Sequence, residues 1–183
     1  MLDIVPFQAK LERFCYSNDI QSVAFANIEN SDFKFKNFSK AMVLGQSFGN
    51  DLMENFDNDI FKFHIKQIER HLSDIAYRIY HFLIIEGYNA LILPPFFFRN
   101  SNKFSNLNKK TAQLAGMGFI GKNDFFLSPT YGVKMVLCSI LTNAPLETDE
   151  EYKINLCKEC GICDENNFYE SFKKCPYGKD KLK

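Results

Sequence analysis

The sequence predicts an α/β or α+β fold, with helices covering a mixed sheet, followed by a small cysteine-rich metal-cluster segment. Three observations support this prediction. One long stretch carries apolar residues at steps of three and four, which is typical of an amphipathic helix. Short apolar runs that suit buried strands lie on both sides of it. After Pro145 the composition changes to an acidic stretch and then to clustered cysteines. We therefore expect an α/β domain over residues 1–150 and a cysteine-rich segment over residues 151–183.

The long helix is predicted over residues 59–86, with Asp57 or Asn58 as its N-cap and Gly87 ending it. Its inward stripe consists of Ile60, Phe63, Ile68, Leu72, Ile75, Ile79 and Leu83. Further helices are expected over residues 7–16 and 109–115. Strands are expected over residues 22–26, 41–45, 88–93, 125–127 and 133–141.

Charge and apolar content exclude several classes of protein. The 22 basic and 22 acidic residues balance, whereas a general nucleic-acid binder needs a basic surplus to neutralise phosphates. No apolar run reaches the roughly twenty residues of a membrane span, and the first residues do not form a secretory signal. We therefore expect a cytoplasmic protein. In that reducing compartment, clustered cysteines more often bind metals than form disulfides.

Four cysteines near the end of the sequence form the strongest motif. Cys157, Cys160 and Cys163 are separated by two residues each, and Cys175 precedes a proline after eleven more residues. This order matches the start of the bacterial ferredoxin pattern, except that the last gap is longer and no second run of cysteines occurs. Cys175 is therefore free to complete the first cluster, and we expect one 4Fe-4S cluster.

Two other interpretations of these cysteines remain open. Four thiolates also suit a structural zinc ion, although zinc sites usually combine two Cys-x-x-Cys pairs. Free thiols or disulfides are the third interpretation. Cys15 and Cys138 lie in apolar surroundings and are expected to be buried and inert. His64, His71 and His81 share the long helix but lack a further ligand, so we expect surface or half-buried side chains.

A glycine-rich stretch forms the second motif. Gly116, Gly118 and Gly121 match the dinucleotide pattern Gly-x-Gly-x-x-Gly, but a helix precedes them and a strand-like segment follows, the reverse of the Rossmann arrangement. The glycines indicate a sharp turn or a close approach of the backbone to another group. Lys122 and Asn123 would place a cation and an amide at that turn, suited to an anionic or amide-bearing ligand. A solvated lysine is the alternative, and we also expect the Lys109-Lys110 pair to be solvated.

Three blocks in this order resemble the epoxyqueuosine reductase-like iron–sulfur proteins. They are AGMGFIGKN at residues 115–123, PTYG at 129–132 and ILTNAPL at 140–146, followed by the cysteine run. The resemblance implies a fold like that of nitroreductase-like corrinoid-binding proteins, in which iron–sulfur clusters pass electrons to cobalamin. It also implies that Gly116, Gly118, Gly121, Lys122 and Asn123 contact the corrinoid.

The sequence departs from that family at the catalytic acid. The family's Asp-Tyr-His stretch lies near the start of the long helix, where this chain has Asp57, Asp59 and His64 but no Asp-Tyr-His. Asp59 is better explained as a helix cap. The catalytic residue is thus unidentified, and the sequence does not predict epoxyqueuosine reduction itself.

Three functions fit these observations. The first is a redox protein whose cluster passes single electrons to a bound cofactor, with a corrinoid as one candidate, or to a small substrate. Its partner would be a redox protein or a small molecule. The second is a non-catalytic binding module with a structural zinc held by the same four cysteines. The third is a family member that has lost its cofactor. The substrate and the oligomeric state are not indicated by the sequence.

Overall fold

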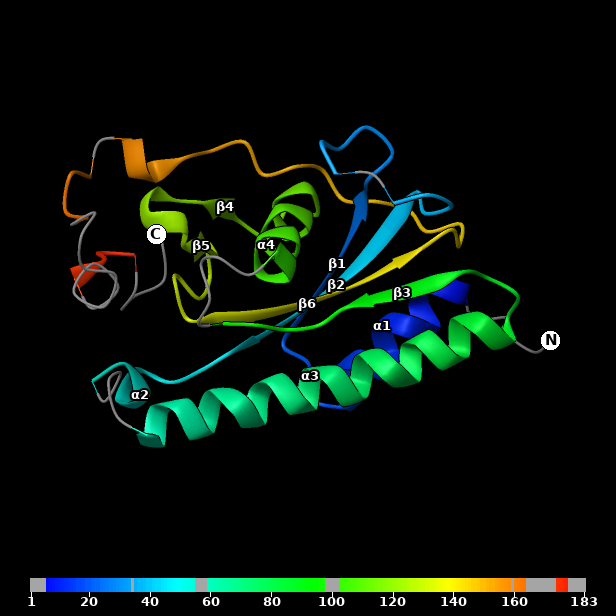
Figure 1. Cartoon of the computed structure of the whole chain (residues 1–183), viewed down its shortest axis with the longest axis horizontal. Helices are drawn as coiled ribbons and strands as arrows, with labels where there is room; N and C mark the ends of the chain where they lie inside the picture. Colours follow the sequence, from blue (N-terminus) through cyan, green and yellow to red (C-terminus); the bar gives the residue numbers. More distant parts are fainter. Residues whose placement is uncertain are drawn as a thin grey trace.

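The computed structural model describes residues 6–33, 35–54, 59–97, 103–158, 160–163 and 174–177. For Glu54, Asn123 and Lys158 it describes the backbone alone. The proposed caps Asp57 and Asn58 lie outside the described residues. Figure 1 shows an elongated molecule in which a twisted sheet separates two helical layers.

A four-stranded sheet in the order β1-β2-β6-β3 forms the centre of the fold. All three of its strand pairings are antiparallel, so the predicted class is confirmed in its α+β form. The strands are β1 (Ser22–Asn27), β2 (Lys40–Ser47), β3 (Ala90–Leu93) and β6 (Met135–Thr142). Every residue of β6 is buried because helices cover both faces of the sheet, which explains its continuous apolar sequence.

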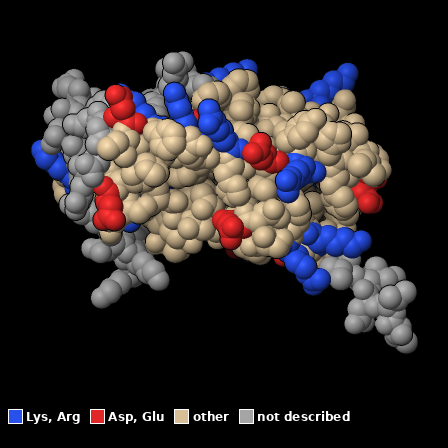
Figure 2. Space-filling model, turned by 90° about the horizontal axis from the view of Figure 1, so that it is seen from below, with Lys and Arg blue, Asp and Glu red and all other residues tan. Residues whose placement is uncertain are grey.

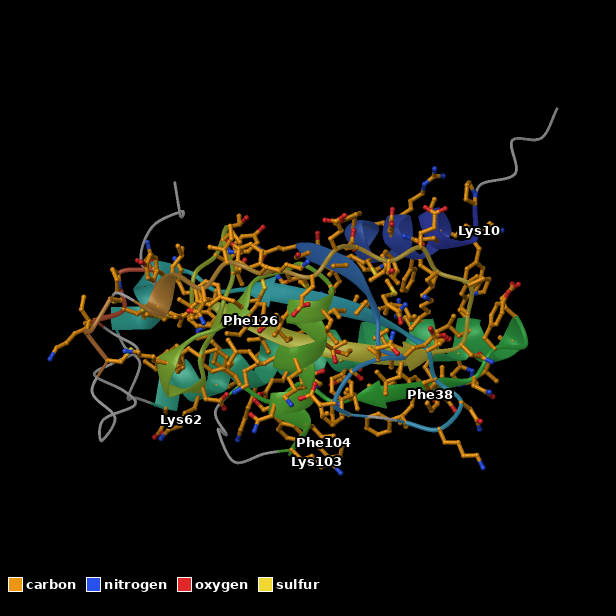
Figure 3. All side chains as sticks on the ribbon, turned by 90° about the horizontal axis from the view of Figure 1, so that it is seen from above. Lys10, Phe38, Lys62, Lys103, Phe104 and Phe126 are labelled. Atoms are coloured by element: carbon orange, nitrogen blue, oxygen red, sulfur yellow. The ribbon has the colours of Figure 1, made fainter. Side chains whose placement is uncertain are left out.

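One face of the sheet packs against α1 (Phe7–Ser17) and the long helix α3 (Asp59–Ile85) (Figure 1). Alternate residues of the strands, such as Met42 and Ile140, point toward this helical layer. The other face packs against α4 (Lys103–Leu114), which contacts residues such as Val43 and Leu141. Figure 3, which views the molecule from the α4 side, shows Phe126 beside this helix. The core therefore has two parts, one on each face of the sheet.

The long helix ends as predicted, but its first two turns pack through a different face from the one predicted. Gly87 has φ +86°, and the N–H of Tyr88 donates to the carbonyl of Leu83, which is a Schellman-type C-terminus. The predicted inward positions Ile60 and Phe63 were wrong, since their side chains are 61% and 58% exposed. In the first two turns the core contacts come instead from the neighbouring apolar residues Phe61 and Ile65.

Several shorter elements were not predicted. α4 begins at Lys103, six residues before the predicted start, and a short helix α2 (Asn50–Glu54) follows β2. After α4, the unpredicted strand β4 (Phe119–Ile120) pairs with β5 (Phe126–Leu127), which confirms the strand predicted over residues 125–127. The 3-10 turn η1 (Lys122–Asp124) joins the two. A second 3-10 turn, η2 (Leu156–Lys158), begins the cysteine segment. None of the described helices combines the length and the apolar character that a membrane span requires.

The acidic stretch before the cysteines packs along the domain. The N–H of Asp149 donates to the carbonyl of Phe25 at 2.8 Å, and its carboxylate accepts from the N–H of Phe25 at 2.8 Å. Tyr152 donates its N–H to the carbonyl of Gln113 and stacks its ring on Phe119. Figure 1 shows this segment passing over α4 to η2, at the end of the molecule where β4 and β5 lie.

Candidate metal centre and glycine loop

The first predicted ligand, Cys157, lies in the middle of η2. The side-chain oxygen of Asn155 accepts a hydrogen bond from the N–H of Cys157 at 3.0 Å, which fixes the start of the turn. The Cys157 side chain is buried and belongs to the core on the α3 side of the sheet. It is thus held by packing as well as by the backbone.

The other three predicted ligands differ in how far their side chains are exposed. Cys175 is buried in the same core, and the nearby Tyr177 hydroxyl donates to the carbonyl of Leu156 at 3.4 Å. Cys160 and Cys163 are half-buried, on either side of Gly161, whose φ of +64° favours glycine. The four thiols therefore extend from the core toward solvent.

The thiols are close enough to influence one another's protonation. Burial raises the pKa of Cys163, and the neighbouring Cys157 and Cys160 raise it further, while the ammonium of Lys122 opposes them. Burial also raises the pKa of Cys175 to about 11, opposed by a hydrogen bond from the Tyr177 backbone and reinforced by the other three thiols. Neighbouring thiolates thus make those of Cys163 and Cys175 harder to form, and a bound cation would reverse this preference.

The described part of the chain contains no group of three or more His, Cys, Asp or Glu side chains that could hold a metal ion. The four thiols therefore influence one another without being drawn together around a single ion.

The glycine loop and the cysteines are in direct contact. A Cβ atom placed on Gly121 would lie 2.7 Å from Sγ of Cys157 and 2.5 Å from Cδ1 of Leu127. Both distances are too short for a real side chain, so residue 121 must be glycine for Cys157 to occupy its position. The two motifs, separated by 35 residues of sequence, thus form one site.

The other two glycines of the loop pack against the protein's own backbone. A Cβ on Gly116, whose φ is +74°, would lie 2.6 Å from the carbonyl oxygen of Glu150. A Cβ on Gly118, whose φ is +156°, would lie 2.1 Å from the carbonyl oxygen of Leu127. The close approach expected from these glycines is thus made to the acidic segment and to β5. Their contact with a corrinoid remains a prediction.

Lys122 and Asn123 form the turn η1 between β4 and β5. The Lys122 side chain is exposed, and its charge acts on Cys163. For Asn123, the turn places the backbone in the loop beside the cysteines. The role of both residues toward a ligand remains a prediction.

Sequence reasoning missed the residue that anchors this loop. Lys109 was expected to be solvated, but it is only 7% exposed and its ammonium binds the carboxylate and the carbonyl oxygen of Asp124. Burial lowers the pKa of Lys109, and Asp124 opposes that shift. Its neighbour Lys110 is exposed, as expected, and pairs with Asp32. The residue one helical turn earlier, Ser105, is also polar and buried, so apolar spacing could not have identified Lys109 as a buried residue.

A small cavity of about 40 Å³ adjoins this ion pair. Asn108 lines it and is 1% exposed; its amide nitrogen donates to the carbonyl of Pro94 at 2.9 Å, while its Oδ1 has no hydrogen-bond partner among the described residues. This volume is large enough for one ordered water, which would satisfy that oxygen.

The remaining cysteines and histidines match their expectations. Cys15 and Cys138 are fully buried, and burial raises the pKa of each thiol to about 12. His64 and His81 are exposed and His71 is half-buried, all on α3. Asp59 is exposed and pairs with Lys62 one turn later at 3.0 Å.

Known proteins resemble this chain in part of its sequence and in its fold. An epoxyqueuosine reductase from Synechococcus sp. (strain RCC307) is 39% identical over 57 residues, which are 31% of this chain and 18% of the reductase. The solved epoxyqueuosine reductase from Streptococcus thermophilus superposes with a TM-score of 0.57 at 17% identity, covering 87% of this chain and 51% of that one. The resemblance to the epoxyqueuosine reductase-like family is confirmed.

The fold is also shared with a second group of redox enzymes. A reductive dehalogenase, described in connection with B12-dependent dehalogenation, superposes with a TM-score of 0.69 at 18% identity, over 85% of this chain and 23% of the dehalogenase. No family model matches the chain. The chain spans about half the length of the solved reductase, and its sequence match covers less than a fifth of the curated relative.

Proposed function

We propose that this chain is an iron–sulfur redox protein that passes single electrons to a group bound beside the glycine loop. The observation that supports the proposal best is the contact between Gly121 and the sulfur of Cys157. It joins the ferredoxin-like cysteines and the loop of the reductase-like signature in one site. A cluster at the cysteines would thus lie next to whatever the loop binds.

The donor set suits one 4Fe-4S cluster held by Cys157, Cys160, Cys163 and Cys175. Thiolates are the ligands that such clusters use, and each would bind a different iron, which allows wider spacing than a single ion does. Such a cluster, when bound, supplies one-electron oxidation and reduction. The chain's own contributions are the buried thiols of Cys157 and Cys175, the space left at Gly121 and the charge of Lys122.

A direction for electron flow follows from burial. Cys160 and Cys163 are the more exposed ligands, so a redox partner protein would approach the centre from their side. Cys157 faces Gly121, so the acceptor would lie toward the loop. The acceptor is either a bound cofactor or a small-molecule substrate.

Anaerobic purification tests the cluster. We expect a brown protein with broad visible absorption, containing about four irons and four sulfides per chain, as a four-iron cluster requires. The Cys163→Ala variant should lose much of this iron, whereas the Cys138→Ala variant, which alters a thiol in the core, should keep it. A colourless wild type with one zinc per chain would contradict the proposal and support the structural zinc module. A colourless, metal-free protein would support a member that has lost its cofactor.

A corrinoid is the cofactor that we propose at the loop. The reductive dehalogenase that shares this fold is described as B12-dependent. Within the described residues, the space beside Gly116 and Gly118 is filled by backbone and that beside Gly121 by side chains, so the corrinoid would meet the exposed Lys122 and not the glycines themselves. Titration with hydroxocobalamin should shift the corrinoid's visible spectrum, and the Lys122→Gln variant should weaken that binding. An unchanged spectrum with folded wild-type protein would exclude cobalamin. We do not extend the proposal to epoxyqueuosine reduction, because the Asp-Tyr-His stretch is replaced.

A further inference from the structure

The solvent face of α3 carries a second stripe of regularly spaced residues. Its members follow one another at alternating steps of three and four and are Ile60, Phe63, Gln67, Arg70, Asp74, Tyr77, His81 and Ile84. Such spacing is the 3-4 pattern of a coiled-coil seam. The residues that pack on the sheet, such as Ile65, Leu72 and Ile79, lie on the opposite side of the helix.

This stripe exposes several large apolar side chains to solvent. Ile60, Phe63, Tyr77 and Ile84 are 61%, 58%, 56% and 43% exposed, respectively. His81 adds a further ring, which lies edge-on to Tyr77 at 5.0 Å between centroids. Figure 2, the view onto the α3 side, shows uncharged surface interrupted by side chains of both charges. Large exposed side chains gathered toward both ends of one stripe indicate a contact surface.

The stripe is complementary to itself when reversed. In two antiparallel copies of α3 that cross level with Leu72, Ile60 lies opposite Ile84 of the other copy and Phe63 lies opposite His81. Gln67 then lies opposite Tyr77, and Arg70 opposite Asp74. In heptad notation Ile60, Gln67, Asp74 and His81 are a positions, and the other four residues of the stripe are d positions. Every layer therefore pairs an a position with a d position, as an antiparallel coiled coil requires. Apolar layers therefore occupy both ends of the seam and opposite charges occupy its centre.

The central charges lack ion-pair partners within the described chain. Neither Arg70 nor Asp74 makes a salt bridge to a described residue, although both are exposed and one helical turn apart. In the antiparallel pair, two Arg70–Asp74 contacts form across the two-fold axis. Opposite charges at the centre of a seam set its register and orientation.

We propose that the occupant of this face is a second copy of the chain, forming a two-fold symmetric dimer through antiparallel α3 helices. The 27 residues of α3 span about 40 Å, enough for all four types of layer on each side of the axis. The proposed contact uses none of the four cysteines, so this proposal does not rest on the redox function.

Charge exchange tests both the dimer and its register. Arg70→Asp makes the centre of the seam wholly acidic, and Asp74→Arg makes it wholly basic. We expect wild-type protein to rise from one to two chain masses in sedimentation equilibrium as its concentration increases. Each single variant should remain monomeric over the same range, while an equimolar mixture of the two variants should again form dimers. Lys36→Asp, which makes the same charge change in the exposed β1–β2 loop, is the matched control and should dimerise like wild type.

Other outcomes would overturn the proposal. Monomeric wild type at all concentrations would show that no second copy covers this face. Dimers that persist in both single variants would show association through another surface. If the mixture of the variants stays monomeric while far-UV circular dichroism shows both variants folded, the antiparallel register is wrong. All substituted side chains are exposed, so folding should be retained.

Discussion

Lys109 of α4 donates a hydrogen bond from Nζ to the carbonyl oxygen of Asp124 at 2.7 Å and also binds the Asp124 carboxylate. Asp124 has φ +61°, a left-handed conformation uncommon outside glycine. The ammonium therefore holds the turn η1 in an otherwise unfavourable shape. Because Lys122 belongs to the same turn, this ion pair positions the loop that faces the cysteines.

The two partners of this pair should contribute unequally to stability. Asp124→Asn leaves the nearly buried ammonium without its counter-charge, and we expect a loss of about 1–3 kcal/mol in the free energy of unfolding. Lys109→Met leaves only the Asp124 carboxylate, whose side chain is 36% exposed, and should cost less. Urea unfolding of both variants measures the difference. Equal losses, or a larger loss for Lys109→Met, would contradict this account of the burial.

The three loop glycines should respond differently to alanine. Gly118→Ala would bring Cβ to 2.1 Å from a backbone oxygen, so we expect loss of the fold. Gly121→Ala meets only the ends of the Leu127 and Cys157 side chains, so the fold should survive while Cys157 is displaced. We expect this variant to keep its circular dichroism spectrum and to retain less iron when purified anaerobically. Gly49→Ala, where a Cβ meets nothing within 4 Å, is the control. Unchanged iron content in Gly121→Ala would argue against a shared site.

The buried thiols predict a loss of stability at alkaline pH. Burial raises the pKa of Cys138 from 9.0 to about 12, so above pH 9 the unfolded chain releases a proton that the folded chain keeps. This stabilising preference is complete below pH 9 and is lost progressively up to about pH 12, at no more than about 1.4 kcal/mol per pH unit. In Cys138→Ala, the decline in unfolding free energy between pH 9 and 11 should be shallower than in wild type. An identical slope in wild type and Cys138→Ala would contradict the raised pKa of Cys138.

Lys122 should tune the reduction potential of the proposed cluster. Its positive charge favours the reduced, more negative state, so Lys122→Gln should lower the potential. An exposed ion pair contributes about 0.2–1 kcal/mol, which corresponds to roughly 10–40 mV for one electron. Spectroelectrochemical titration of wild type and variant measures the shift, with Lys36→Gln as a distant control. An equal or higher potential in Lys122→Gln would place the centre away from the loop.

The sequence predicted the parts of the fold in which local pattern and burial agree. α1, β1, β2, α3 and β6 were found within a few residues of their expected bounds, because their apolar spacing matches the faces that the core covers. The early start of α4 was missed because Ser105, Asn106 and Asn108 favour turns, and the burial of Ser105 and Asn108 in the folded chain is not visible in the sequence.

The site was predictable in its residues but less so in its contacts. Spacing identified the cysteines and the glycines separately, yet nothing in the sequence shows that Gly121 touches Cys157. The prediction that Lys109 is solvated was wrong because its partner, Asp124, is 15 residues away in the sequence. The turn η1 brings Asp124 close to Lys109. Ile60 and Phe63 were assigned to the core because an outward coiled-coil-like stripe has the same spacing as an inward one.

The pairing of Asp149 with Phe25 has a consequence for solubility. β1 is an edge strand of the sheet, and the acidic segment occupies hydrogen-bonding groups that the edge would otherwise present to neighbouring molecules. The segment that leads to the cysteines thus also protects the edge strand from pairing with other molecules. A chain shortened before residue 146 would uncover that edge, and we expect it to form intermolecular β-structure before any loss of its remaining helices.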